Sequence, residues 1–155
     1  MSLIRFHQAQ ADPHAGYDTA LAEIRCGRKT SHWIWYIFPQ LAGLGRSSMA
    51  EKYAIRDLVE ACDYLRDPLL RARYEEITAA VSDQLAGGLA IETLMGSGID
   101  ALKLISSLTL FRDAAARLAS ADPAFARSFA ALVEVILKHA NAHGYSPCAR
   151  TLTLL

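Results

Sequence analysis

The chain has 155 residues, of which 52% are hydrophobic and 21% are charged, and its 16 basic residues balance 16 acidic ones. A chain of this length and hydrophobicity can bury a core without disulfides or metals, which argues against a disordered protein. The zero net charge and the lack of an apolar run of about 20 residues argue against a nucleic-acid partner and against a membrane partner.

The cysteines and histidines do not form a recognisable metal or disulfide pattern. Cys26, Cys62 and Cys148 are odd in number, and none belongs to a Cys-x-x-Cys pair, which is typical of free thiols in a reducing compartment. His139 and His143 are four residues apart, but no glutamate follows the first, so they favour a solvated helix end. The first residues contain no apolar signal core. We therefore expect a cytoplasmic protein without metal or cofactor.

The first part of the chain contains two helix patterns. A short apolar face predicts a helix over Leu3–Gln10. Asp12-Pro13 combines a preferred N-cap with a preferred first helical residue, and predicts that a second helix starts there. Apolar residues recur at helical spacing over Tyr17–Ile24, and Gly27 favours a left-handed C-cap.

The segment Trp33–Phe38 is apolar without a helical or strand period, and it contains both tryptophans of the chain. Proline at position 39 favours extended geometry at Phe38. Because no second strand is available for pairing, we predict a buried segment that is extended or forms a single helical turn.

Capping signals mark the later helices. Ser48-Met-Ala-Glu51 is a capping box that predicts a helix reaching about Ile55, and Asp57 begins another helix. Asp67-Pro68 predicts a helix over 68–86, and Asp122-Pro123 predicts the last long helix.

The remaining segments complete a helical pattern. A short apolar turn over Ala90–Met95 precedes a helix of about 18 residues near Asp100. The apolar tail Thr151–Leu155 follows a loop over 145–150, and we expect it to pack on the body. No hairpin signal occurs. The sequence predicts an all-α fold: one domain over 1–155, a single compact irregular bundle of about six to eight helices around a buried aromatic segment.

Polar residues flank the aromatic segment and form the first candidate site. Its predicted ligand-binding residues include Lys29, Ser31, Trp33, Trp35 and Gln40. The two tryptophans can sandwich a base or sugar ring if both point the same way, and the alternative is that they fill the core.

His32 lies within the same stretch. Imidazole titrates near neutral pH, so His32 can act as a general acid or base, or hold a phosphate. The alternative is a histidine that ties a loop to a backbone carbonyl.

A glycine-containing turn precedes the helix start near Ser48. Gly43, Gly45, Arg46 and Ser47 can bind an anion through backbone amides, the helix dipole and a guanidinium group. The spacing matches neither a P-loop nor a dinucleotide fingerprint. The alternative is a turn followed by an ordinary helix cap.

A polar strip interrupts the helix after residue 98. Asp100, Lys103 and Ser107 are spaced to share one face. A lysine and a serine can act as base and nucleophile, so we predict His32, Lys103 and Ser107 as catalytic residues and Asp100 as a ligand-binding residue. The alternative is that the serines and Thr109 bond back to their own helix carbonyls.

A set of motifs covers nearly the whole chain: Ser31-His-Trp-x-Trp-x-Ile-Phe-Pro-Gln40, Gly43-Leu-Gly-x-Ser47, Tyr53-Ala-Ile55, Tyr64-Leu-x-x-Pro-x-Leu70, Asp100-x-x-Lys-x-x-Ser-Ser-Leu-Thr-Leu-Phe111 and Thr151-Leu152. Together these motifs resemble a bacterial family known as domain of unknown function 1810, sometimes mislabelled calpastatin. The resemblance implies an all-helical fold and no established activity. In the family an acidic residue usually stands shortly before the final Thr-Leu, and this chain has Ser146-Pro-Cys-Ala-Arg150 there.

The residues favour a small-molecule site for an anion or nucleotide. An aromatic wall beside an anion-binding helix start suits a nucleotide- or ADP-ribose-like ligand, and glycosidic or phosphoester hydrolysis is the reaction class to test. Two alternatives stay open: a non-catalytic protein-interaction module, and a homodimer formed through exposed apolar helix faces.

Overall fold

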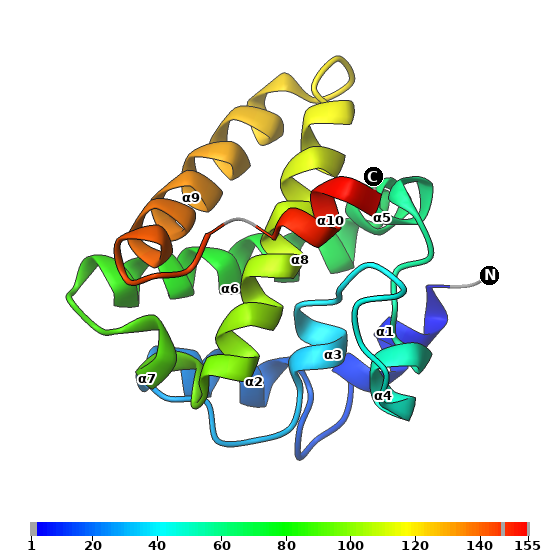
Figure 1. Ribbon diagram of the computed structural model, residues 1–155. Coiled ribbons are helices and arrows are strands. Elements are labelled where there is room, and N and C mark those ends of the chain that lie inside the picture. Colours follow the sequence, from blue (N-terminus) through cyan, green and yellow to red (C-terminus); the bar gives the residue numbers. More distant parts are fainter. Residues whose placement is uncertain (1–2, 147, 155) are drawn as a thin grey trace.

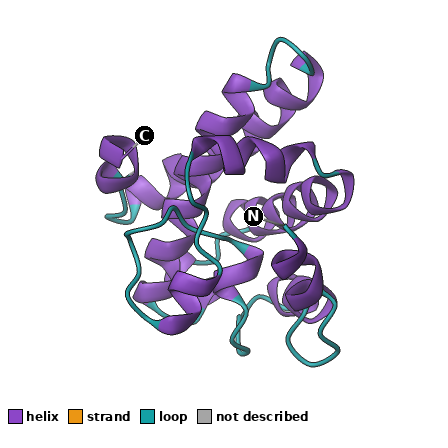
Figure 2. Cartoon of the chain, turned by 90° about the vertical axis from the view of Figure 1, so that its right-hand side faces the viewer, coloured by secondary structure: helices purple, strands orange, loops and turns teal. Residues whose placement is uncertain are grey.

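The structure is a computed structural model that describes residues 3–146 and 148–154. Within these ranges the chain forms helices and no strand (Figure 2), and α8 runs through the middle of the molecule (Figure 1). The helices are α1 (Ile4–Gln10), α2 (Tyr17–Arg25), α3 (Ile34–Ile37), α4 (Ser48–Lys52), α5 (Leu58–Arg66), α6 (Pro68–Ala86), α7 (Ile91–Met95), α8 (Gly98–Arg117), α9 (Pro123–Ala142) and α10 (Ala149–Leu154). The all-α prediction is confirmed. Short one-turn segments such as α3, α4 and α7 bring the described helices above the six to eight expected.

An aromatic cluster fills the centre of the molecule. Phe38, Tyr64, Tyr74 and Phe111 are each no more than 1% exposed, and their rings meet at centroid distances of 4.6–6.1 Å. Helix α8 supplies Phe111 and packs against α5, α9, α7, α10 and α3. Burial of aromatic rings at these distances is a large stabilising contribution, because each ring removes up to about 250 Å² from water.

The tryptophan-rich segment adopts one of the two predicted forms, a single helical turn. Helix α3 spans only Ile34–Ile37, and Trp33 and Phe38 on either side of it are fully buried. An isolated parallel β-bridge between Leu41 and Ile55 holds the nearby backbone, and the described residues form no sheet there. The segment therefore lies inside the helical body, as expected.

Aspartate caps start three helices as predicted. The side chain of Asp57 accepts a hydrogen bond from the Glu60 amide, and Asp67 and Asp122 cap α6 and α9, each with proline at the next position. Each cap satisfies an amide that the helix itself leaves unpaired.

The predicted start of the second helix at Asp12-Pro13 is wrong. Asp12 Oδ1 accepts hydrogen bonds from the amides of His14 and Ala15 at 2.7 and 2.9 Å, which closes a turn instead. Helix α2 begins only at Tyr17, after Gly16. A side chain at Gly16 would place a Cβ 2.2 Å from the Asp12 carbonyl oxygen, so the tight turn requires glycine there.

Two other boundaries also differ from expectation. Ser47, rather than Ser48, caps α4 by accepting from the Ala50 amide at 3.1 Å, and that helix ends at Lys52. The tail is helical from residue 149 rather than a loop to 150, and Leu152 and Leu154 in α10 stay about half exposed. Position 155 lies outside the described residues.

Across residues 3–146 and 148–154, no helix combines the length and apolarity needed to span a membrane. All three cysteines are free thiols, and Cys62 is buried at the α5–α8 contact, as a small core residue.

Candidate functional site

Two loops meet at the N-terminal end of α8. The amide of Lys29, in the loop after α2, donates to the Leu94 carbonyl oxygen at 2.8 Å. Gly96 has φ +82°, and a Cβ there would lie 2.8 Å from the Lys29 carbonyl oxygen. Glycine is therefore needed at position 96 both for its backbone conformation and for the close approach of the two loops.

Glu23 in α2 holds the first of these loops in place. Its carboxylate accepts four hydrogen bonds, from the amides of Thr30 and Ser31, the Ser31 hydroxyl and Trp33 Nε1, at 2.5–2.9 Å. Burial raises the pKa of Glu23, but the hydrogen bonds from Ser31, Thr30 and Trp33 outweigh it and lower the pKa to about 2. The carboxylate therefore stays ionised and fixes both the loop and the Trp33 ring.

Lys29 is a buried cation. It is 8% exposed, and its Nζ donates to the Ser31 carbonyl oxygen at 2.6 Å and pairs with Asp100 Oδ2 at 2.8 Å. The Trp33 ring centroid lies 5.0 Å from the same nitrogen. Two of the three N–H donors thus have oxygen partners, and the charge is compensated by a carboxylate from the first turn of α8.

Lys103 lies one turn further along α8. Its Nζ is 3.9 Å from Asp100 Oδ1, beyond hydrogen-bond length, and 5.3 Å from the centroid of the partly buried Trp35 ring. Its side chain is 23% exposed. Within residues 3–146 and 148–154, its ammonium group thus has an ion pair and a ring contact but no hydrogen bond. It is the cation in this region that can still bind an anion directly.

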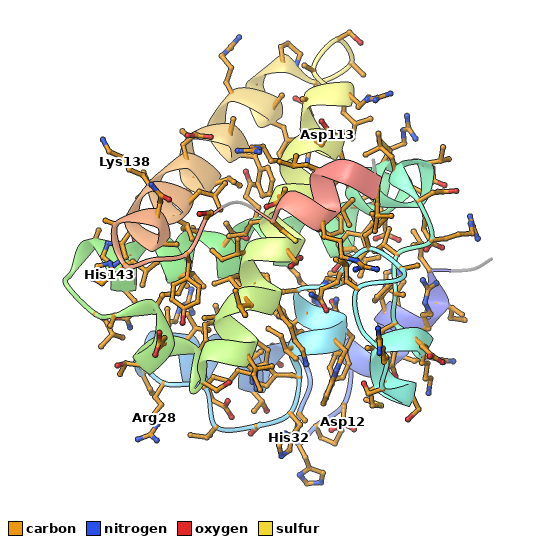
Figure 3. The ribbon with its side chains drawn as sticks, viewed as in Figure 1. Asp12, Arg28, His32, Asp113, Lys138 and His143 are labelled. Carbon is orange, nitrogen blue, oxygen red and sulfur yellow. The ribbon has the colours of Figure 1, made fainter. Side chains whose placement is uncertain are left out.

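A hollow of about 220 Å³ opens beside these residues. It lies at the N-terminus of the 20-residue helix α8, where Ser97 Oγ accepts from the Asp100 amide and the helix dipole is positive. His32 is exposed at its edge, on the loop at the periphery of the molecule (Figure 3). The lining residues are Lys29, Thr30, His32, Met95, Gly96, Ser97 and Asp100.

The structure brings some of the predicted site residues together and not others. Lys29, His32 and Asp100 line the hollow, whereas Lys103 is not among its lining residues and lies beside it, 3.9 Å from Asp100 Oδ1. The Ser31 hydroxyl donates to the Glu23 carboxylate and so helps to hold the loop in place. The two tryptophans diverge: Trp33 is fully buried in the core, so they form no sandwich.

Ser107 lies in the core instead of the hollow. It is fully buried, and its Oγ is 2.7 Å from the Tyr74 hydroxyl oxygen. Ser106 and Thr109 donate to carbonyls of their own helix, at Leu102 and Ile105, as the alternative interpretation of the strip expected. Helix α8 enters the core after Lys103, so a position one turn further along has protein on every side.

The glycine-containing turn also lies away from the hollow. Gly43, Gly45, Arg46 and Ser47 do not line it, and Ser47 is occupied by its cap hydrogen bond. A Cβ at Gly45 would lie 2.5 Å from the Ala50 Cβ, so this glycine serves packing. The carbonyl oxygen of Gln40 accepts from the Ile55 amide at 2.8 Å, which fixes the chain before the turn.

Several residues that form or support the hollow were not among the predicted ones: Thr30, Met95, Gly96 and Ser97 line it, and Glu23 holds its loop. Ser97 stands three residues before Asp100, a capping pattern that is readable from the sequence. Glu23 gives no comparable signal, because its four donors lie in a loop whose path no local pattern determines. No group of three or more His, Cys, Asp or Glu side chains in the described part of the chain could hold a metal ion.

The comparisons with known proteins identify the family but no activity. The crystal structure of the conserved hypothetical protein Rv1873 from Mycobacterium tuberculosis is similar, with 38% identity, a TM-score of 0.75, and coverage of 99% of this chain and 95% of that one. No curated protein matches. The family model described as "Protein of unknown function (DUF1810)" matches residues 1–135. The chain therefore belongs to the DUF1810 family, as its sequence motifs predicted.

Proposed function

We propose that the hollow at the start of α8 binds the phosphate-bearing end of a small anionic metabolite, of a nucleotide- or ADP-ribose-like kind. The observation that carries this proposal is the position of Lys103, whose ammonium group has no hydrogen bond within the described chain and lies 3.9 Å from Asp100. A cation with unused donors next to a long helix N-terminus favours a ligand with negative charge.

Size limits what enters the hollow. A volume of about 220 Å³ is below the roughly 300–1,000 Å³ of sites that enclose a whole drug-sized ligand. A phosphate group fits within it, whereas a base or ribose has to extend across the surface. The partly buried Trp35 ring beneath Lys103 is the aromatic surface available to such an extension.

His32 is the proposed proton-transfer group if the bound ligand is hydrolysed. It is exposed at the edge of the hollow, so its ring can exchange protons with solvent. Asp100 is less suited to this role, because its carboxylate is already engaged by the Lys29 ammonium group at 2.8 Å. The proposed ligand contains phosphoester and glycosidic bonds. Hydrolysis of the phosphoester is therefore the first reaction to assay, and hydrolysis of the glycosidic bond is the second.

The experiment is a thermal-shift and calorimetric titration with inorganic phosphate, pyrophosphate, AMP and ADP-ribose. A ligand at 100 times its Kd should stabilise the fold by about 2.7 kcal/mol. Lys103→Met should weaken binding by about tenfold, the loss of one charge-assisted hydrogen bond. His32→Ala should leave binding within a few fold and abolish any hydrolysis.

Lys138→Met is the matched control, since this exposed lysine lies on α9, on the opposite side of the molecule from His32 (Figure 3). It removes the same charge and should change nothing. The proposal fails if none of the four anions binds, or if Lys138→Met weakens binding as much as Lys103→Met does.

A further inference from the structure

A second hollow, of about 240 Å³, lies between α1, α4 and α5. We call it the Glu60 hollow. It shares no lining residue with the hollow at the start of α8. Three cations and two carboxylates line it, so its surroundings carry a net positive charge: Arg5, Lys52, Arg56, Glu51 and Glu60.

Glu60 carries an unsatisfied polar atom into the wall of this hollow. The residue is 2% exposed, and its Oε1 accepts from Arg5 Nη2 at 3.0 Å and from the Arg56 amide at 2.9 Å. Its Oε2 is buried and has no hydrogen-bond partner among residues 3–146 and 148–154. The guanidinium Nη1 of Arg56 is 3.9 Å away, too far for a hydrogen bond.

A buried carboxylate oxygen without a donor is costly, because it has lost its hydrogen bonds to water and gained no hydrogen bond in return. The missing partner must be a hydrogen-bond donor. The net positive charge around the hollow favours a donor that belongs to an anion over one that belongs to an amine. Arg56 is about half exposed, so a ligand can displace its side chain and reach Oε2.

We propose that the Glu60 hollow binds a small hydroxy acid. The hydroxyl group donates to Glu60 Oε2, and the carboxylate groups pair with Lys52 and Arg56. Lys52 is exposed and, within the described residues, engages only the Tyr53 ring, at 5.2 Å, so its ammonium donors are available. The volume of about 240 Å³ suits a ligand of this size and is too small to enclose a whole nucleotide.

The test compares L-malate with succinate, which differs only in lacking the hydroxyl group. Calorimetric titration of the full chain should show malate binding about tenfold more tightly, the value of one hydrogen bond to a charged acceptor. Glu60→Gln should remove this preference, and Lys52→Met should weaken both ligands several fold.

Lys138→Met, on α9, is the control variant and should bind both acids as the natural chain does. Because Glu60→Gln also disturbs the contact with Arg5, amide chemical shifts of Ala42 and Ala54 in the unmodified chain give a second readout. These amides should move with malate. Equal affinity for the two acids, no binding of either, or shifts located at the α8 hollow instead would overturn the proposal, whatever the phosphate titrations show.

Discussion

Glu23 concentrates four hydrogen bonds on one carboxylate, and no positively charged group among residues 3–146 and 148–154 contacts it at hydrogen-bond distance. All four donors belong to the loop that carries Lys29 and to the adjacent Trp33. This carboxylate therefore determines where Lys29 lies, although it does not line the hollow itself. It acts as a positioning residue for the site.

Glu23→Gln should destabilise the fold by about 2–3 kcal/mol at pH 7, since an amide cannot accept four donors as a carboxylate does. The folded pKa of Glu23, about 2, is below its ordinary value of 4.5. The carboxylate therefore contributes its full stability above pH 4.5 and loses it as the pH falls toward 2. Urea unfolding followed by circular dichroism, from pH 7 to pH 2.5, measures this.

The difference between Glu23→Gln and the natural chain should thus shrink on acidification. Glu134→Gln is the control, because Glu134 is 66% exposed and meets Arg112 only at 3.5 Å. A difference that stays constant from pH 7 to pH 2.5 would contradict the role assigned to Glu23.

Ser107 allows a direct comparison of a structural role with a catalytic one. Ser107→Ala should cost about 1–3 kcal/mol, because it leaves the buried Tyr74 hydroxyl without a partner. It should not change anion binding at the α8 hollow. Burial already raises the pKa of Tyr74, so its hydroxyl stays protonated and needs an acceptor.

Adding Tyr74→Phe to Ser107→Ala should cost less than the sum of the two single changes, since both polar groups are then removed together. Chemical denaturation of the natural chain, the two single variants and the double variant measures the coupling free energy between Ser107 and Tyr74. If a folded Ser107→Ala chain lost ligand binding, Ser107 would have a role in the site and not only in the core.

At the scale of elements, the turn before α4 depends on one contact between small residues. Gly45→Ala should destabilise the fold by about 1–3 kcal/mol, because the added methyl group lies 2.5 Å from Ala50 Cβ. Gly87→Ala, at the end of α6, is the matched control: its φ is −75° and its new Cβ would meet neighbours at 3.4 Å or more.

Thermal unfolding compares the two variants. Gly87→Ala should be neutral or slightly stabilising, because alanine restricts the unfolded chain. If the two substitutions shift Tm equally, then steric contact with Ala50 is not what makes glycine necessary at position 45.

For the whole molecule, the helical class and three helix starts could be predicted because their causes are local. Asp57, Asp67 and Asp122 each cap the helix that follows, and the aspartate, with proline next to it in two cases, is visible in the sequence. Asp12 failed as a helix start because its carboxylate is equally able to close a turn, which Gly16 then completes.

The candidate site could be predicted only in part. Lys29 was expected in the site because it flanks the aromatic segment, and Asp100 because it lies on the polar strip of α8. The two side chains meet at 2.8 Å. The depth at which α8 enters the core decides that Lys103 stays at the surface and Ser107 does not. That depth depends on packing against α5, α6 and α9, which no local pattern specifies.

The homodimer and the protein-interaction module stay predictions, and the exposed apolar side chains are the surface that either would use. Large exposed apolar side chains occur on α1, α5, α6, α8, α9 and α10: Ile4, Val59, Leu69, Ile99, Leu102, Val135, Leu152 and Leu154. Light scattering at micromolar concentration separates a dimer from a monomer, and a monomeric mass would remove the first alternative.

The divergence of the two tryptophans gives the protein an internal optical probe. Trp33 is sealed in the core, whereas Trp35 lies partly exposed beneath the Lys103 ammonium group. Emission from the two indoles should therefore separate into a component that dissolved quenchers such as iodide cannot reach and a component that they can. A ligand that extends from the α8 hollow over the Trp35 ring should shield the second component from iodide, so a fluorimeter can report on the site without any label.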